Sequence, residues 1–297
     1  MRIGQATLRP VLESVEFSVP LQAFISDIGP ADIAPHADWL YPQHLHPDTG
    51  HCRMSLHAWL IEANGKRILV DPCVGHQRHR PTVPIFHMLD SPFLERLAAL
   101  GVAPEQIDYV FCTHLHVDHV GWNTRLHDGS HVPTFPNARY LFSRAEDDYW
   151  RSDMQGGLGA ADVFNAGVYA ECVQPVIAAG LADRIDAGTR IADCLTLIDA
   201  PGHTIGHLAG LLESAGEGAV LAGDAVHHPL QVVFPKGEVS AYDPAQALAT
   251  RRRLYDLCVN KDYWLAPAHF RAPHLCKLRK EGESYRVEWA ESVEGRP

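Results

Sequence analysis

Apolar and polar residues alternate in blocks along the chain, and the clearest block predicts a β-hairpin. Two short apolar runs, residues 56–62 and 66–71, are separated by Asn64-Gly65. Asn and Gly accept the positive φ angles of a two-residue type I′ turn, and the flanking runs have the length of strands. We therefore expect two antiparallel strands joined at Asn64-Gly65.

The middle of the chain alternates between helical and strand patterns. A short helix is predicted between Ser91-Pro92, a typical helix start, and Gly101, a typical helix end, because apolar residues recur there at helical spacing. Downstream we expect buried strands at 107–113 and 138–143, a helix from 144 to 150, a break at the glycines within 156–159, and weak helix over 160–179.

The last third of the chain has short apolar runs separated by turn residues, which is typical of an antiparallel sheet. Strands are expected at 195–200, 207–212, 219–222 and 263–266, with a helix that begins at Asp243-Pro244. That helix has one apolar stripe, and Arg251, Arg252 and Arg253 fall largely outside it, so we expect them to be solvated. Strands in two batches favour an α+β fold, with two stacked sheets and helices outside.

Composition and charge narrow the class of protein. The 297 residues are 46% hydrophobic and 21% charged, and a mean hydropathy of -0.12 is too low for a chain built from membrane spans. The net charge of -11 disfavours a nucleic-acid partner. Seven scattered cysteines without a C-x-x-C pair indicate reduced thiols, and no secretory signal is visible. We expect one domain over residues 1–297, located in the cytoplasm.

The candidate chemistry lies in a cluster of metal-binding residue types. Residues 113–119 have the sequence T-H-L-H-V-D-H, directly after a predicted buried strand. In an extended segment His114 and His116 point to the same side, whereas Asp118 and His119 can reach a second position a few ångströms away. Two adjacent metal sites are therefore expected. Imidazole and carboxylate ligands without thiolate suit Zn²⁺, Mn²⁺, Co²⁺ or Fe²⁺.

Three further segments have a related form, in which a strand ends in a small or Gly-containing turn with a ligand at its tip. They are residues 200–203, which end in His203, residues 221–224, which end in Asp224, and residues 266–269, which end in His269. The alternative is that these are coincidental surface histidines of a chain with 19 His. Four ligand-bearing segments in similar local contexts favour the metal site.

These residues resemble the metallo-β-lactamase superfamily of hydrolases, whose signature is H-x-H-x-D-H followed by a distant His, an Asp and a final His. The resemblance spans roughly residues 56–269 and implies the αββα four-layer sandwich. It implies that one metal is held by His114, His116 and His203, that a second is held by Asp118, His119 and His269, and that Asp224 bridges them. Asp71 resembles the buried aspartate that supports the metal loop.

Two metal ions about 3.5–4 Å apart can hold a bridging water and lower its pKa toward neutrality, which favours hydrolysis of an ester-like bond. Zn²⁺ is the expected cofactor, two ions per chain, and Asp118 can pass a proton from the nucleophile to the leaving group. We therefore expect a hydrolase that cleaves a lactone, a carboxylic ester or a phosphotriester. The expected partner is a small-molecule substrate, without nucleic acid or membrane, and a homodimer is a candidate assembly.

The branch of the superfamily depends on fewer residues. The stretch 202–207, G-H-T-I-G-H, resembles quorum-quenching lactonases, but these often carry a Tyr three residues after the bridging Asp, where this chain has His227. A His at that place is similar to the methyl parathion hydrolase branch. We expect either that His227 contacts the substrate oxygen or leaving group, or that it is a packed histidine. His207 and His228 are expected to have structural roles.

Other functions remain as alternatives at this point. They are a glyoxalase II-like thioesterase, a mononuclear iron sulfur-oxidising enzyme of the same fold, and a metal-binding domain without activity. The substrate pocket is expected to be apolar, with aromatic residues from the loops around the metals as its candidates, namely Trp39, Phe86, Trp122 and Phe234. The irregular spacing of the remaining histidines between residues 44 and 87 does not favour a further metal site.

Overall fold

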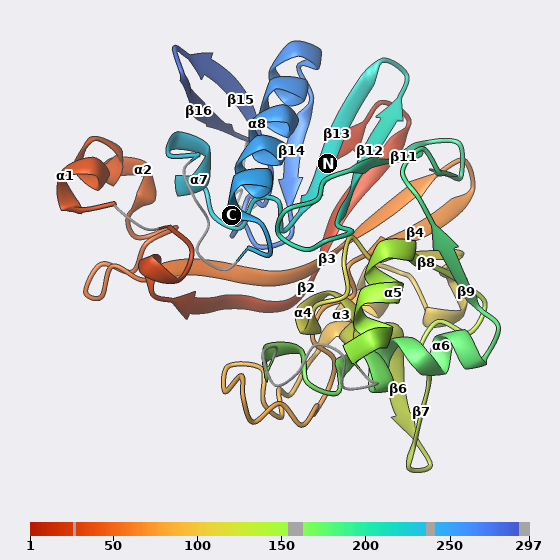
Figure 1. Ribbon diagram of the computed structural model, residues 1–297. Helices are drawn as coiled ribbons and strands as arrows, with labels where there is room; N and C mark the ends of the chain where they lie inside the picture. Colours follow the sequence, from red (N-terminus) through yellow and green to blue (C-terminus); the bar gives the residue numbers. More distant parts are fainter. Residues whose placement is uncertain (26–27, 154–162, 236–240, 291–297) are drawn as a thin grey trace.

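Two seven-stranded β-sheets stacked face to face form the centre of the computed structural model, which describes residues 1–25, 28–153, 163–235 and 241–290 (Figure 1). The first sheet has the order β1 (Arg2–Ile3), β2 (Ala6–Val19), β3 (Cys52–Ala63), β4 (Lys66–Val70), β5 (Tyr109–Phe111), β8 (Arg139–Ser143) and β9 (Ala182–Ile185). The second has the order β10 (Arg190–Ile191), β11 (Leu195–Asp199), β12 (Leu208–Ser214), β13 (Glu217–Gly223), β14 (Trp264–Pro267), β15 (Cys276–Glu281) and β16 (Ser284–Trp289). Each sheet is therefore built from one contiguous part of the chain.

Helices cover the outer face of each sheet. The first sheet is covered by α3 (Phe93–Ala99), α5 (Arg144–Asp153) and α6 (Gln174–Ala178), and the second by α8 (Pro244–Lys261). A small hairpin, β6 (Thr124–His127) and β7 (Ser130–Pro133), extends beside the first helical layer. The result is the four-layer αββα arrangement of the α+β class that the sequence predicts.

Apolar side chains fill three layers: one between the two sheets, and one between each sheet and its outer helices. Along β3, Ala58 and Leu60 face the outer helices, whereas Trp59 and Ile61 face the second sheet, because successive side chains of a strand point to opposite faces. All four side chains are buried. A strand buried on both faces has a continuous apolar sequence, which explains why residues 56–61 show little polar alternation.

The predicted hairpin turn and the predicted start of α8 are present. Asn64 and Gly65 have φ angles of 53° and 72°, so the hairpin between β3 and β4 closes as expected. Asp243 caps α8, where its carboxylate accepts a hydrogen bond of 3.0 Å from the Gln246 amide. The helix ends at Lys261, and the next residue, Asp262, caps it with a left-handed φ angle of 52°.

Two expectations change at the level of elements, and a third is not tested. Arg251 is not solvated: its side chain is wholly buried and Nε donates to the Ala225 carbonyl at 2.8 Å, while Arg252 and Arg253 are exposed as predicted. The weak helix expected over 160–179 is broken into a 3-10 turn, Val163–Asn165, a π-helical segment, Tyr169–Val173, and α6, while residues 160–162 lie outside the described residues. The glycine break at 156–159 lies outside the described residues.

The first fifty residues, which the hydrophobic pattern left unassigned, have two roles. Residues 6–19 form β2, a long strand that pairs with β3. The following segment contains α1 (Pro30–Ile33) and α2 (Ala37–Leu40) and packs with Met54 and Leu230 in an apolar cluster. In the part of the chain that the structure describes, no helix has the length and apolar character needed to cross a membrane.

Candidate metal centre

The predicted ligands come together because their strands end at the same edge of the two sheets. In the first sheet β4 and β5 run parallel, so Asp71 and the segment 113–119 leave the sheet side by side. In the second sheet β13 and β14 run parallel, which brings Asp224 and His269 together. His203 follows β11, which has the same direction as β13 because β12 is antiparallel to both.

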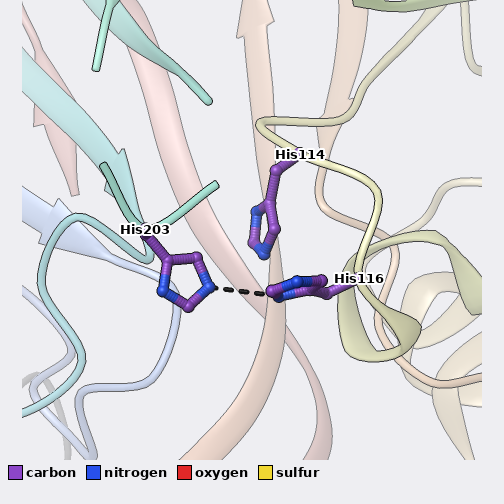
Figure 2. A group of neighbouring side chains, drawn as sticks. All are labelled: His114, His116 and His203. Atoms are coloured by element: carbon purple, nitrogen blue, oxygen red, sulfur yellow. Dashed lines mark hydrogen bonds between the residues drawn. The ribbon is translucent and has the colours of Figure 1, made fainter. Parts of the chain in front are cut away.

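The first ligand group consists of His114, His116 and His203, whose ligand nitrogens lie within 4.8 Å of one another (Figure 2). Nε2 of His203 lies 3.1 Å from Nδ1 of His116. His114 is fully buried, His203 is 6% exposed, and His116 is partly exposed. The three rings converge from two different sheets, as the resemblance implied.

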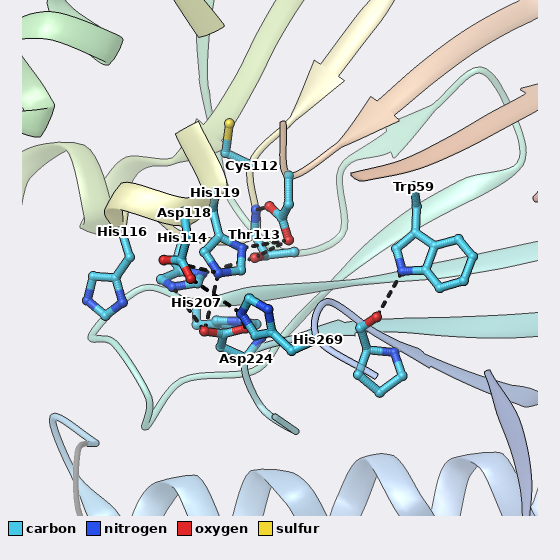
Figure 3. A network of polar contacts seen from close by, with 12 residues as sticks. Trp59, Cys112, Thr113, His114, His116, Asp118, His119, His207, Asp224 and His269 are labelled. Carbon is cyan, nitrogen blue, oxygen red and sulfur yellow. Dashed lines mark hydrogen bonds and ion pairs between the residues drawn. The ribbon is translucent and has the colours of Figure 1, made fainter. Parts of the chain in front are cut away.

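The second ligand group consists of Asp118, His119 and His269, which also converge within 4.8 Å (Figure 3). The Asp118 carboxylate lies 3.8 Å from Nε2 of His119 and 3.5 Å from Nε2 of His269. Asp118 and His119 belong to the one-turn helix α4 (Val117–Val120), which directly follows His116. This short turn redirects the chain, so His119 lies beside His114, with ring centroids 4.1 Å apart, and also faces His269, with ring centroids 5.4 Å apart.

Asp224 lies between the two groups. Its Oδ2 is 3.5 Å from Nε2 of His203 in the first group and 3.2 Å from Nε2 of His119 in the second. Its Oδ1 is 3.2 Å from Nε2 of His269. One carboxylate therefore faces ligands of both groups, which is the arrangement that a bridging ligand requires.

In three of the ligand histidines, Nδ1, the ring nitrogen that faces away from the centre, contacts a neighbouring polar atom. Nδ1 of His114 lies 3.1 Å from the Thr113 hydroxyl, and Nδ1 of His119 lies 3.1 Å from Oδ2 of Asp71. Nδ1 of His269 donates to the Ser55 carbonyl at 3.1 Å. Each contact turns Nε2 toward the centre, as the outer partners of metal-bound histidines do.

Asp71, the predicted support of the metal loop, contacts two parts of that loop. Its carboxylate accepts hydrogen bonds from the Thr113 amide at 2.7 Å and from the Thr113 hydroxyl at 2.8 Å. It thus fixes the start of the 113–119 segment as well as the ring of His119. His207 supports the opposite side, because its Nε2 accepts a hydrogen bond from the Asp224 amide at 3.1 Å.

The pKa shifts of the ligand residues follow from burial and from the charges of neighbouring ligands. Burial, together with neighbouring imidazoles, holds the pKa of His114 and His116 well below its ordinary value, so both rings carry a free lone pair. Burial would raise the pKa of Asp224, but the facing imidazoles outweigh burial and hold it well below its ordinary value. Burial likewise opposes protonation of His119, yet the surrounding carboxylates raise its pKa well above the usual range.

In the described part of the chain, some of the predicted ligand atoms have no hydrogen-bond partner, and a divalent ion would bind them. Nε2 of His114 is buried and has no hydrogen-bond partner among the described residues, and the carboxylate nearest to it in an ion pair, Asp224 Oδ2, is 3.9 Å away. An unpaired buried polar atom is costly. Six imidazole or carboxylate ligands with a shared aspartate are a set that Zn²⁺ and similar ions accept. The seven predicted ligand residues therefore fit a pair of metal ions.

His227 also faces this centre. Its Nε2 lies 3.1 Å from Oδ2 of Asp224, and with His203 and Asp224 it forms another convergent group. Its ring packs against Phe24, with ring centroids 4.9 Å apart. His228, by contrast, points away and its Nε2 contacts the His44 carbonyl at 2.8 Å, which is the structural role expected for it. Among the described residues, the histidines between 44 and 87 form no convergent group.

A cavity of about 400 Å³ opens onto the ligands. Beside the ligand residues and His227, its walls are apolar and largely aromatic, formed by Phe17, Val19, Ala23, Phe24, Met54, Ile85, Phe86 and Phe164. None of the described lining residues is Lys or Arg. A larger groove of about 640 Å³ lies between β11 and α8, and its described lining contains none of the predicted ligands.

Only one of the four predicted pocket residues, Phe86, lines this cavity. Trp122 is directed inward, where its Nε1 donates to Glu13 at 2.7 Å. Trp39 packs near Trp289 with ring centroids 6.3 Å apart, and Phe234 packs on His36 at 5.5 Å. The lining from β2 and from the segment after it was not predicted from the sequence. The polar and apolar alternation at the end of β2 was a signal for a strand, but not for its place beside the metal ligands.

The matches to known proteins agree with this geometry. The model of the metallo-beta-lactamase superfamily matches residues 53–269. This match covers more than half of the chain and contains every predicted ligand. The chain therefore belongs to the metallo-β-lactamase superfamily.

Curated relatives match part of the chain. One is a hydroxyacylglutathione hydrolase from Methylobacillus flagellatus, 27% identical over 168 residues, which are 57% of this chain and 46% of that protein. Another is the N-acyl homoserine lactonase AttM from Rhizobium johnstonii, 29% identical over 144 residues, which are 46% of this chain and 48% of that protein. The chain thus spans about half the length of these relatives.

Solved structures match almost the whole chain and support the fold. A structure titled as the hydrolase AbOPH in the beta lactamase superfamily has a TM-score of 0.79 at 24% identity, and the match covers 99% of this chain and 97% of that one. The structure of AidC, a dizinc quorum-quenching lactonase in complex with a product, has a TM-score of 0.77 at 19% identity, with the same coverage.

Proposed function

We propose that this protein is a metal-dependent hydrolase that cleaves a lactone, a carboxylic ester or a phosphotriester of a small, neutral and largely apolar molecule. The observation that carries this proposal is Asp224, whose two oxygens face ligands of both groups at the floor of an apolar cavity. Two divalent ions, Zn²⁺ first among the candidates, would be held by the seven predicted ligand residues.

Such ions, when bound, supply a water of lowered pKa and positive charge for the oxygen on which negative charge develops. The side chains of the protein then have separate tasks. Asp118, 9% exposed and part of the cavity wall, can accept the proton of the attacking water and return it to the leaving oxygen. His227 lines the same wall and can donate a hydrogen bond to the substrate oxygen or to the leaving group.

The cavity wall supports a neutral apolar substrate. Phe17, Phe86 and Phe164 form a row, with ring centroids 5.9 and 6.3 Å apart, and Phe164 reaches the ring of His116 at 5.8 Å. Aromatic side chains in a cavity favour apolar groups, and the few polar atoms beside the metals orient the scissile bond. Relatives named as N-acyl homoserine lactonases add support for a lactone as substrate.

A hydroxyacylglutathione thioesterase is the second candidate, since two curated relatives carry that name. Glutathione has carboxylate groups, and a site that recognises them needs cationic side chains. The described lining of the cavity offers none. We therefore propose thioesterase activity as the second candidate, after hydrolysis of a lactone, an ester or a phosphotriester.

The test is to purify the protein without chelator, to determine its metals by elemental analysis, and to assay one sample against four substrates. These are an acyl lactone, an aryl ester, a phosphotriester and a glutathione thioester. Two divalent ions per chain with turnover of the lactone, ester or phosphotriester are expected. Preferred turnover of the thioester would replace the first candidate by the second. A single iron per chain without hydrolysis of any of the four would refute both.

A further inference from the structure

One buried carboxylate near the metal centre belongs to neither ligand group. Glu146 is the third residue of α5, directly after β8, and its side chain is wholly buried. A carboxylate in such a place is costly unless several hydrogen bonds compensate for the lost water. Its position in the first turn of the helix also favours negative charge.

The two oxygens of Glu146 hold two different loops. Oε2 accepts a hydrogen bond of 3.2 Å from the amide of Leu115, the residue between His114 and His116. Oε1 accepts a hydrogen bond of 2.8 Å from the amide of Gly206, three residues after His203. One loop leaves the first sheet and the other belongs to the second sheet, so this carboxylate connects the two halves of the fold.

The contact with the second loop needs a glycine. A Cβ atom placed on Gly206 would lie 2.7 Å from the Ser143 hydroxyl and 2.8 Å from both Ala145 Cβ and the Glu146 amide. Real Cβ atoms essentially never come so close, so any other residue would push the loop away from α5. Gly206 therefore gives the loop of His203 its close approach to Glu146.

The contact with the first loop is supported on both sides. The Leu115 carbonyl accepts a hydrogen bond of 2.9 Å from the Asn165 side chain, while its amide is held by Glu146. Trp150, one turn further along α5, donates from Nε1 to Oε2 of Glu146 at 3.0 Å, and its ring contacts that of His116 edge-on at 5.6 Å. The Leu115 backbone is thus held by hydrogen bonds to the side chains of Glu146 and Asn165.

We propose that Glu146 is a positioning residue for the first metal site. By holding the Leu115 and Gly206 amides at once, its carboxylate sets the distance between the loop of His114 and His116 and the loop of His203. The inference rests on the metal binding that the proposed function requires and makes no use of the substrate. Its direct consequence is selective, because among the described residues the hydrogen bonds of the Glu146 carboxylate go to Leu115, Trp150 and Gly206, and none goes to Asp118, His119 or His269.

The test is the variant Glu146→Gln, in which one oxygen becomes an amide nitrogen that cannot accept a hydrogen bond. Chelator-treated protein is titrated with Co²⁺ by visible absorbance and with Zn²⁺ in competition with a coloured chelator, at pH 7.5. We expect one of two binding steps to weaken by about 10–100-fold, the usual effect of losing an outer partner of a ligand. The other step should stay within about threefold. His203→Ala, which removes the first site, identifies the step concerned.

Glu13→Gln is the matched control. Glu13 is also a buried glutamate that accepts hydrogen bonds from a tryptophan Nε1 and from two backbone amides, but those amides belong to Val74 and Gly75 and carry no ligand. It should leave both binding steps within about threefold. Trp150→Phe, which removes one donor but keeps both loop contacts, should do the same.

If Glu146→Gln does not fold, Gly206→Ala tests the same contact from the other side and should weaken the same step. Unchanged binding of both ions in Glu146→Gln, or an equal loss in Glu13→Gln, would overturn the positioning role. These measurements need no substrate. A protein that binds two ions normally but hydrolyses none of the four substrates would refute the proposed function and leave the role of Glu146 intact.

Discussion

At the scale of single residues, the ligand set depends most on Asp224. It faces ligands of both groups, with carboxylate to nitrogen distances of 3.2 Å to His119 and to His269 and 3.5 Å to His203. The other ligands serve one group each. Removing Asp224 therefore affects both metal ions, whereas removing His203 or His269 affects one group first.

We expect Asp224→Ala to lower the metal content below two ions per chain and to lower kcat/KM by at least about 100-fold, because one carboxylate serves both ions. Elemental analysis and the assay on the preferred substrate measure the two effects on the same sample. Asp90→Ala is a suitable control, since that side chain is 91% exposed. A variant that keeps both metals and full activity would exclude a bridging role.

His227 is the residue at which substrate preference is expected to change. Its ring lies between Phe24 and Asp224 on the cavity wall, where a substrate oxygen can reach it. His227→Tyr should raise the ratio of lactone to phosphotriester turnover by about tenfold, equivalent to about 1.4 kcal/mol of transition-state binding. The kcat/KM values for both substrates test this. An unchanged ratio would show that His227 does not contact the substrate.

The ligands could be predicted from sequence because they lie in short motifs at strand ends, and because the resemblance to the superfamily implied how these separate segments group around two metals. The residues that line the pocket could not be predicted in this way. Phe17 and Phe24 belong to the first 25 residues and reach the metals only because β2 pairs with β3. Glu146 was missed for the same reason: its two hydrogen-bond partners are 31 and 60 residues away along the chain.

At the scale of elements, turns and caps were predictable because their geometry is local. Asn64-Gly65 and Asp243-Pro244 behave as their residue types require. Arg251 shows the limit of such arguments. Helical spacing placed it outside the apolar stripe, but the loop after β13 lies against that side of α8 and offers the Ala225 carbonyl as an acceptor. A polar residue is buried when a neighbouring element satisfies its donors.

Glu13 connects three elements and gives the protein a predictable response to pH. From β2 its carboxylate accepts hydrogen bonds from Val74, Gly75, Ser91 and Trp122. Burial raises the pKa of Glu13 to about 7 in spite of these donors. Because the folded state binds this proton more tightly than the unfolded state, its contribution to stability is complete below the ordinary pKa of about 4.5. It is lost as the pH rises through about 7.

Glu13→Gln, a neutral isostere, should abolish that response. Between pH 5 and pH 7 the free energy of unfolding of the wild type, relative to the variant, should fall by up to about 1.4 kcal/mol per pH unit. Thermal unfolding of both proteins in one buffer series measures the difference. A difference that stays constant from pH 5 to pH 8 would contradict the raised pKa.

At the scale of the whole molecule, the candidate metal centre lies between the two sheets. His114, His116, Asp118 and His119 follow β5 of the first sheet, whereas His203, Asp224 and His269 follow strands of the second. Bound ions would therefore add a connection between the two halves, beside the apolar layer that the sheets share. Ligands that bind only the folded state stabilise it in proportion to the logarithm of their concentration.

Removal of the metals should therefore lower the melting temperature. With free metal at 1,000 times Kd, the expected loss is about 4 kcal/mol per site, which corresponds to about 10 °C or more in a protein of this size. Differential scanning calorimetry with and without chelator, followed by return of Zn²⁺, tests this. An equal melting temperature in both states would mean that the ions do not hold the halves together.

The sequential order of strands in the two sheets has a consequence for how this chain could be divided. Residues up to Ile185 supply the first sheet with four of the seven predicted ligand residues, and residues from Arg190 supply the second sheet with the other three. A cut at Gly188, in the turn between them, would give two fragments, neither of which could cover its inner apolar face or complete either ligand group. The two fragments would therefore reassemble only with each other and with metal ions present. This makes the protein a suitable starting point for a split reporter of divalent ions.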